Sequence, residues 1–283
     1  MDTYYALIAD LDASRSYEYG ERRHVQRLLT DVVTFLNCLH DSGLEIPVAF
    51  SAGDEVQGLF SDFGSAFLFF RELSIFMYPH RLHAGIGAGG WEVRAEGGPS
   101  PAQDGTAYHY ARAAIEAAES DRIYRLMVHD GSARLQESVL AGYSLGICAS
   151  RGRRQGEVAR LVELCRPLVA GSAWESSSRC NGELSSARLK LLEAFVDNEY
   201  LRSLVGKGRE PAFPEGAVVD THVSSVIQEG RAHTDQNMRG LSYKLESLAG
   251  ASRTSIDRTI DSGRVLQERD AATLMVLSCA GRI

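Results

Sequence analysis

The first half of the chain alternates short apolar runs with longer segments in which apolar residues recur every three or four positions. Short runs are typical of buried strands, and the longer spacing is typical of helices that face a core. The first run, Tyr4 to Ala9, ends at Asp10. We predict strands over 4–9, 46–50, 56–60, 81–87 and 123–128, and helices over 21–39, 63–77 and 106–118.

This order begins β-α-β-β-α-β, which is the order of a ferredoxin-like "split βαβ" sheet. Beyond residue 132 helical patterns replace the strand signals, and segments 171–186 and 206–220 have the composition of linkers. We expect an α+β fold whose antiparallel ferredoxin-like sheet carries helices, followed by a helical C-terminal part. The expected division is a sheet domain over 1–132, a helical linker or spacer over 133–220, and a helix-turn-helix domain over 221–283.

Two carboxylates are brought together by this topology. Asp10 closes the first strand, and Asp54 lies in the turn between the next two, so the two would stand side by side. Adjacent carboxylates repel unless a cation neutralises them, and oxygen ligands suit Mg²⁺ or Mn²⁺ with nucleotide phosphates completing the shell. Such a site activates a hydroxyl nucleophile and stabilises leaving pyrophosphate. The alternative is that Asp10 caps the next element and Asp54 is an ordinary turn residue.

Four sequence motifs carry a resemblance to known families. They are LIADLD at 7–12, FSAGDEVQGLF at 50–60, RLHAGIG at 81–87 and DGTAYHYARAAI at 104–115. In this order they resemble the metal-binding strand, the Gly-Asp turn, the following strand and the phosphate-contacting helix of GGDEF-type diguanylate cyclases and class III nucleotidyl cyclases. More narrowly, they resemble the SatD family, whose members pair a palm-like domain with a C-terminal helix-turn-helix.

The resemblance implies roles for individual residues. Asp10 and Asp54 would bind the metal with help from the Leu11 carbonyl, and Glu55 would support or deprotonate the nucleophile. The other implied phosphate-binding residues are Ser14, Arg15, Gly53 and Arg112. The chain departs from GGDEF enzymes at Ala52 and Val56, and from class III cyclases at Tyr108, so the resemblance does not fix the base or the ribose contact.

A glycine-rich segment at 85–90 satisfies G-x-G-x-x-G and follows a predicted strand. A dinucleotide site also requires a helix that opens at the third glycine, and here a Gly/Pro loop follows instead. We therefore interpret these glycines as a bent strand end or as a close backbone approach near the ligand.

The C-terminal part has the pattern of a helix-turn-helix. Residues 241–249 predict one helix, and Ser252 is the expected N-cap of a second helix over 253–262. The exposed side of this second helix would present Arg253, Thr254, Ser255 and Arg258 to duplex DNA. The alternative interpretation is that these two helices form an ordinary helical hairpin used for packing or dimerisation.

Charge is distributed unevenly along the chain. Net charge is −7, yet residues 1–130 alone carry 10 basic and 19 acidic side chains, while residues 231–283 carry 8 basic and 6 acidic ones. The acidic balance excludes a surface built entirely for nucleic acid. No signal peptide and no run long enough to span a bilayer are visible, so we expect a cytoplasmic protein without a membrane partner.

Two functions follow from these features. The first is a Mg²⁺- or Mn²⁺-dependent nucleotidyl cyclase or nucleotidyltransferase that acts on a nucleoside triphosphate, with a homodimer implied by the resemblance. The second is a nucleotide-sensing, DNA-binding transcription regulator whose palm-like domain is not catalytic. Hydrolysis of a purine triphosphate is a third possibility on the same scaffold.

Overall fold

A five-stranded sheet forms the N-terminal part of the molecule. The structure is a computed structural model that describes residues 2–12, 17–121, 123–170, 181–195, 212–223, 227–228, 231–232 and 238–280. The strands are β1 (Tyr4–Leu11), β2 (Leu44–Ala52), β3 (Glu55–Phe60), β4 (Leu82–Gly89) and β5 (Leu126–His129). Their order is β2-β3-β1-β4-β5, and all neighbours are antiparallel except the pair β4 and β5.

Helices account for most of the remaining described chain. They are α1 (Tyr19–Leu39), α2 (Phe63–Phe76), α3 (Thr106–Ser120), α4 (Leu135–Ala149), α5 (Arg153–Cys165), α6 (Asn181–Phe195), α8 (Leu241–Ala249), α9 (Arg253–Ser262) and α10 (Val265–Cys279). The short elements are the 3-10 turns η2 (Asp41–Gly43) and η3 (Ser100–Ala102), and the strand pairs β6 (Leu168–Val169) with β7 (Thr221–His222) and β8 (Ile227–Gln228) with β9 (Arg231–Ala232). No helix in the described part of the chain combines the length and apolar character needed to cross a bilayer.

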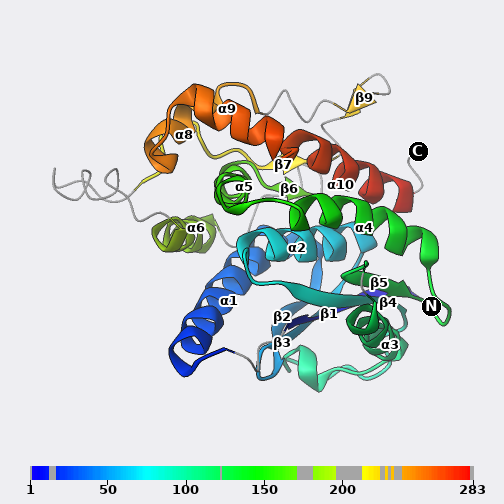
Figure 1. The fold of residues 1–283 in the computed structure, drawn as a ribbon. Coiled ribbons are helices and arrows are strands. Elements are labelled where there is room, and N and C mark those ends of the chain that lie inside the picture. Colours follow the sequence, from blue (N-terminus) through cyan, green and yellow to red (C-terminus); the bar gives the residue numbers. More distant parts are fainter. Residues whose placement is uncertain are drawn as a thin grey trace.

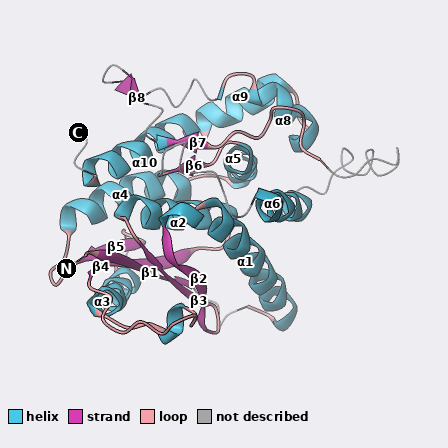
Figure 2. Cartoon of the chain, turned by 180° about the vertical axis from the view of Figure 1, so that it is seen from behind, coloured by secondary structure: helices cyan, strands magenta, loops and turns pink. Residues whose placement is uncertain are grey.

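The sheet separates two hydrophobic cores because side chains alternate between its faces. Along β1, Leu7 and Ala9 join the large core under α1 and α2, whereas Ala6 and Ile8 join a small core under α3. Figures 1 and 2 show α3 on one side of the sheet and α1, α2 and α4 on the other. The functional candidates of the N-terminal part lie on the α3 side.

Helix α2 lies at the centre of the molecule, between the sheet and a second layer formed by α4, α5 and α10 (Figure 1). All but one of its residues are buried, including the charged Arg71 and Glu72, so the helix is enclosed on every side. The large core is continuous from Leu7 in β1 to Leu277 in α10. The C-terminal helices therefore complete the burial of α2, and the expected division at residue 132 stays a prediction.

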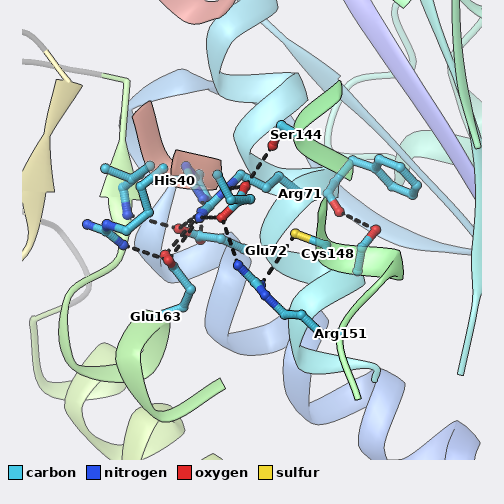
Figure 3. A network of polar contacts seen from close by, with 12 residues as sticks. His40, Arg71, Glu72, Ser144, Cys148, Arg151 and Glu163 are labelled. Carbon is cyan, nitrogen blue, oxygen red and sulfur yellow. Dashed lines mark hydrogen bonds and ion pairs between the residues drawn. The ribbon is translucent and has the colours of Figure 1, made fainter. Parts of the chain in front are cut away.

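Buried ions join α2 to this second layer (Figure 3). Arg71 of α2 donates hydrogen bonds of 2.6 Å from Nε and Nη2 to Glu268, and of 3.0 and 2.9 Å from Nη1 and Nη2 to Glu163. Arg269 Nη1 also donates to Glu163 at 2.6 Å, and the Ser144 hydroxyl donates to Glu268 at 2.6 Å. Burial would raise the pKa of Glu163, but Arg269 and Arg71 hold that pKa below its usual value. The network satisfies charges that would otherwise be costly to bury.

The glycine-rich segment is explained by helix packing. Gly85 and Gly87 of β4 lie directly under α3, and a Cβ atom on Gly87 would lie 2.1 Å from the carbonyl oxygen of Ala107. At Gly85 a Cβ atom would lie 2.2 Å from the carbonyl oxygen of Ala111. The close backbone approach that we expected for these glycines is therefore an approach to α3, and the segment serves helix–strand packing.

The predicted mixture of an antiparallel sheet with many helices is confirmed. The predicted linker 171–186 is wrong at its end, because residues 181–186 belong to α6. Its first ten residues lie outside the described residues, as do residues 206–211 of the second predicted linker.

Candidate nucleotide and metal site

The end of β1 and the β2–β3 loop bring Asp10, Asp54 and Glu55 to one end of the sheet. The register pairs Ala9 with Val56, so Asp10 comes next to the start of β3, and on its other side Asp10 pairs with His83 of β4. Since Ala6 and Ile8 face α3, the alternation places Asp10 on the α3 face as well.

The β2–β3 loop has two residues, Gly53 and Asp54, between the paired residues Ala52 and Glu55. Gly53 has φ of 65°, a left-handed conformation that glycine adopts without steric cost. The glycine thus allows the tight turn that positions Asp54 and Glu55 at the sheet end.

Asp10 and Asp54 interact electrostatically. Burial and the neighbouring Asp54 raise the pKa of Asp10 to about 6, against a smaller lowering by the backbone N–H of Leu11. The Oδ2 atom of Asp54 is buried and has no hydrogen-bond partner among the described residues. Two neighbouring, partly buried carboxylates favour binding of a cation. The cation would remove the repulsion between Asp10 and Asp54 and give Asp54 Oδ2 a partner.

This donor set fits Mg²⁺ or Mn²⁺ as an open site. Within the described part of the chain, no group of three or more His, Cys, Asp or Glu side chains is arranged to hold a metal ion. Asp10 and Asp54 would therefore supply two carboxylates, and the remaining positions would be filled by backbone carbonyl, water or substrate oxygens, as is usual for Mg²⁺. Leu11, whose carbonyl is the expected third protein ligand, is the last residue of β1.

Glu55 and Arg112 form a pair across the α3 face. Arg112 Nη1 and Nη2 donate hydrogen bonds of 2.5 and 2.8 Å to Glu55 Oε2 and Oε1, and the Ser51 hydroxyl also donates to Glu55. These contacts lower the pKa of Glu55 despite its partial burial, with Arg112 as the largest cause. Arg112 stays 44% exposed, so its outer edge is accessible to an anion.

A second ion pair adjoins the carboxylates and was not singled out in the sequence. Arg125 Nη1 donates to Asp12 Oδ2 at 2.7 Å and contacts His83 Nε2 at 3.0 Å. The hydrogen bond from Arg125 lowers the pKa of Asp12. The available signal was the closeness of Asp12 to Asp10, since Asp12 directly follows Leu11, the last residue of β1.

Ser14 and Arg15, the other phosphate-binding candidates, lie outside the described residues.

The DNA-binding candidates are far along the chain on α9. Ser252 caps this helix by accepting a 3.4 Å hydrogen bond from the Ser255 N–H, and Ile256 and Ile260 are buried. Arg253, Thr254, Ser255 and Arg258 are all exposed.

Comparison with protein families gives one result. The model of the SatD family matches residues 4–127. Over this segment the chain is similar to the SatD family. The comparison with curated proteins gave no match. The matched segment contains the carboxylates, Arg112 and Arg125, so the family relationship covers the candidate nucleotide and metal site, whereas α9 lies beyond it.

Proposed function

We propose that this chain, which matches the SatD family over residues 4–127, is a divalent-cation-dependent enzyme that acts on a nucleoside triphosphate as a nucleotidyl cyclase or nucleotidyltransferase. The observation that carries the proposal is the pair Asp10 and Asp54, with a raised pKa on the first and a buried, unpartnered oxygen on the second. The strand order β2-β3-β1-β4 with antiparallel neighbours agrees with a ferredoxin-like palm, which supports the same conclusion.

In the proposed reaction, a 3′-hydroxyl oxygen forms a bond to the α-phosphorus, and the bond from that phosphorus to the pyrophosphate oxygen breaks. A bound Mg²⁺ or Mn²⁺ would lower the pKa of the attacking hydroxyl and neutralise charge on the phosphates. Asp10 and Asp54 hold the cation. Glu55 accepts the hydroxyl proton or orients the hydroxyl. The exposed side of the Arg112 guanidinium contacts the phosphates.

The direct test is incubation of the full chain with each nucleoside triphosphate and Mg²⁺ or Mn²⁺, with products identified by mass spectrometry. We expect pyrophosphate together with a cyclic or linked nucleotide. Asp10→Asn and Asp54→Asn should each lower the rate at least about 100-fold, the scale of losing one strong transition-state contact. Glu96→Gln, in an exposed loop, is the matched control. Orthophosphate with a nucleoside diphosphate would indicate hydrolysis, and no product, or equal activity in the Asp variants, would refute the proposal.

A second candidate function rests on α8 and α9. Their bounds, the Ser252 cap and the exposed Arg253 and Arg258 support a helix-turn-helix that contacts duplex DNA. Arg153 of α5, a helix that packs against α9, is 91% exposed, but its charge is paired with Glu157. In this case the sheet domain would bind a nucleotide as a signal.

DNA binding is measured by the affinity for duplex DNA at increasing salt concentration. Affinity that falls with salt and is lost in Arg253→Ala/Arg258→Ala, but is kept when the exposed Arg27 of α1 is replaced by Ala, supports this candidate. Absence of binding at low salt would contradict it. The homodimer implied by the family resemblance is measured in the same preparations by light scattering.

A further inference from the structure

A cavity lies on the other side of the β4–β5 end from the carboxylates. It has a volume of about 220 Å³ and is bounded by the turn after α2, the starts of β4 and β5, and helices α4 and α5. Its apolar wall includes Tyr78, Leu82, Leu145 and Ala159. Ligand pockets are commonly about 300–1,000 Å³, so this cavity suits a small ligand with about one ring or a short hydrocarbon chain.

The polar wall of the cavity is entirely basic or neutral. Arg81, Arg125, Arg151 and His80 line it, and no Asp or Glu is among the described residues that form its lining. Arg125 is paired with Asp12, and Arg151 lies 3.6 Å from Glu268, so the positive charge of this wall is partly compensated, and a bound anion would neutralise the rest.

The state of Arg151 supports this view. Its side chain is 3% exposed, and although Nε donates to the Gly263 carbonyl at 3.0 Å, Nη2 has no hydrogen-bond partner. The carboxylate facing Nη2 is Glu268, at 3.6 Å, and Glu268 already accepts shorter hydrogen bonds from Arg71 and Ser144. Positive charge at this wall is therefore only partly compensated.

Arg81 and Arg125 stand at the accessible side. Arg81 is exposed, and Arg125 uses Nη1 for both its contact to Asp12 and its contact to His83. A guanidinium has five N–H donors in a planar fork, so Arg125 retains donors on its other nitrogens.

We propose that this cavity binds a small organic anion. Its carboxylate or phosphate group would lie against Arg81 and Arg125, and its apolar part against Leu82, Leu145 and Ala159. The site is distinct from the candidate nucleotide and metal site, but Arg125 borders both, because it also holds Asp12 beside the carboxylates.

The test is a calorimetric titration of the full chain with benzoate, phenyl phosphate and the neutral benzamide, without divalent cations. We expect saturable binding of at least one anion, about ten-fold tighter than benzamide, since a hydrogen bond to a charged group contributes on that scale. The ratio of benzoate to phenyl phosphate affinity tells which anionic group the site prefers.

Variants locate the binding. Arg81→Gln, at an exposed side chain, and Ala149→Phe, at an exposed position of the cavity wall, should each weaken the bound anion about ten-fold while keeping the fold intact. Arg22→Gln, at an exposed residue of α1, and Arg112→Gln, at the candidate nucleotide site, should leave the affinity for the anion unchanged.

Three results would overturn the proposal. They are benzamide binding as tight as that of the anions, anion binding that Arg81→Gln and Ala149→Phe both leave unaltered, and no saturable binding up to about 10 mM. A loss of affinity confined to Arg112→Gln would likewise assign the anion to the nucleotide site. The nucleotide proposal is unaffected by these outcomes, because its test requires a divalent cation and Asp54.

Discussion

Arg112 of α3 donates two hydrogen bonds, of 2.5 and 2.8 Å, to Glu55 of β3, although the two residues are 57 positions apart in the chain. The arginine to which the family resemblance gives a phosphate contact is therefore already paired with the carboxylate to which it gives a role at the nucleophile. A triphosphate would compete with Glu55 for this guanidinium.

Glu55→Gln should therefore tighten nucleoside triphosphate binding, by about three- to ten-fold, because the arginine no longer has an anionic partner. Turnover should fall in the same variant, since the amide cannot accept the hydroxyl proton. Fluorescent-nucleotide titration measures the first effect and product formation the second. Glu96→Gln, at an exposed loop acid that does not shift the pKa of Arg112, is the control and should change neither. Weaker binding in Glu55→Gln would contradict this competition.

Asp10 should make stability depend on pH. Its pKa in the folded protein is about 6, raised by burial and by Asp54, whereas an unfolded chain has about 3.9. The folded state thus binds the proton more tightly, so this group lowers stability above about pH 6 and ceases to do so as the pH falls towards about 4. Asp10→Asn should raise stability at about pH 8 by about 1 kcal/mol, allowing for solvent screening, and hardly at about pH 4. Thermal unfolding at both pH values measures the difference, and an equal effect at both would show that the repulsion is absent.

Divalent cations should stabilise the wild-type chain by occupying the same pair. Mn²⁺ or Mg²⁺ at 100 times its dissociation constant adds about 2.7 kcal/mol to the free energy of unfolding. Asp54→Asn, which leaves one carboxylate, should lose this gain, whereas Glu96→Gln should retain it. The readout is the melting temperature without nucleotide, so it is independent of enzymatic activity. If a cation raised the melting temperatures of Asp54→Asn and Glu96→Gln equally, it would be binding at another place.

The apolar pattern was sufficient to predict the sheet elements and the two helices α8 and α9. Strand β1 is a short apolar run buried on both faces, and in α8 and α9 the buried residues recur at helical spacing. Helix α10 is not predicted by the sequence. Glu268, Arg269 and Thr273 are buried there, and polar residues at core positions hide the helical periodicity.

Pairing between distant residues could not be predicted either. The carboxylates Asp10 and Asp54 were brought together by strand topology alone, but the Arg112–Glu55 pair depends on how α3 crosses the sheet. Arg71 and Glu268 are 197 positions apart, and nothing local in the sequence connects them. Their contact follows from the packing of α10 against α2.

Because Glu163 is part of the buried ion network, we expect its replacement to lower the free energy of unfolding strongly. Glu163→Gln leaves the fully buried Arg71 and Arg269 short of one negative charge, which should cost about 3–5 kcal/mol. Glu157→Gln, on the same helix, removes an exposed pair with Arg153 and should cost less than about 1 kcal/mol. Urea unfolding of both variants measures the contrast. Similar costs at the two positions would mean that the network contributes no more than a surface pair.

Helix α3 carries Arg112, so its contact with β4 decides where that guanidinium lies. A Cβ atom at Gly87 would lie 2.1 Å from the Ala107 carbonyl oxygen and 2.2 Å from the Ala111 nitrogen, both backbone atoms that cannot move without the helix. Gly87→Ala should therefore push α3 off the sheet and destabilise the fold by at least about 2 kcal/mol.

Gly146→Ala is the matched substitution. Gly146 lies within α4 with no atom within 4 Å of an added Cβ, so alanine there should stabilise the protein by about 0.5–1 kcal/mol. Chemical denaturation gives both free energies, and a nucleotide titration of Gly87→Ala at low denaturant shows whether Arg112 has moved with the helix. The two substitutions should change the free energy of unfolding in opposite directions. Gly87 contacts the backbone of α3, whereas at Gly146 alanine only restricts the unfolded chain and favours the helix. If Gly87→Ala were as stable as wild type, α3 would not be seated on β4 by its glycines.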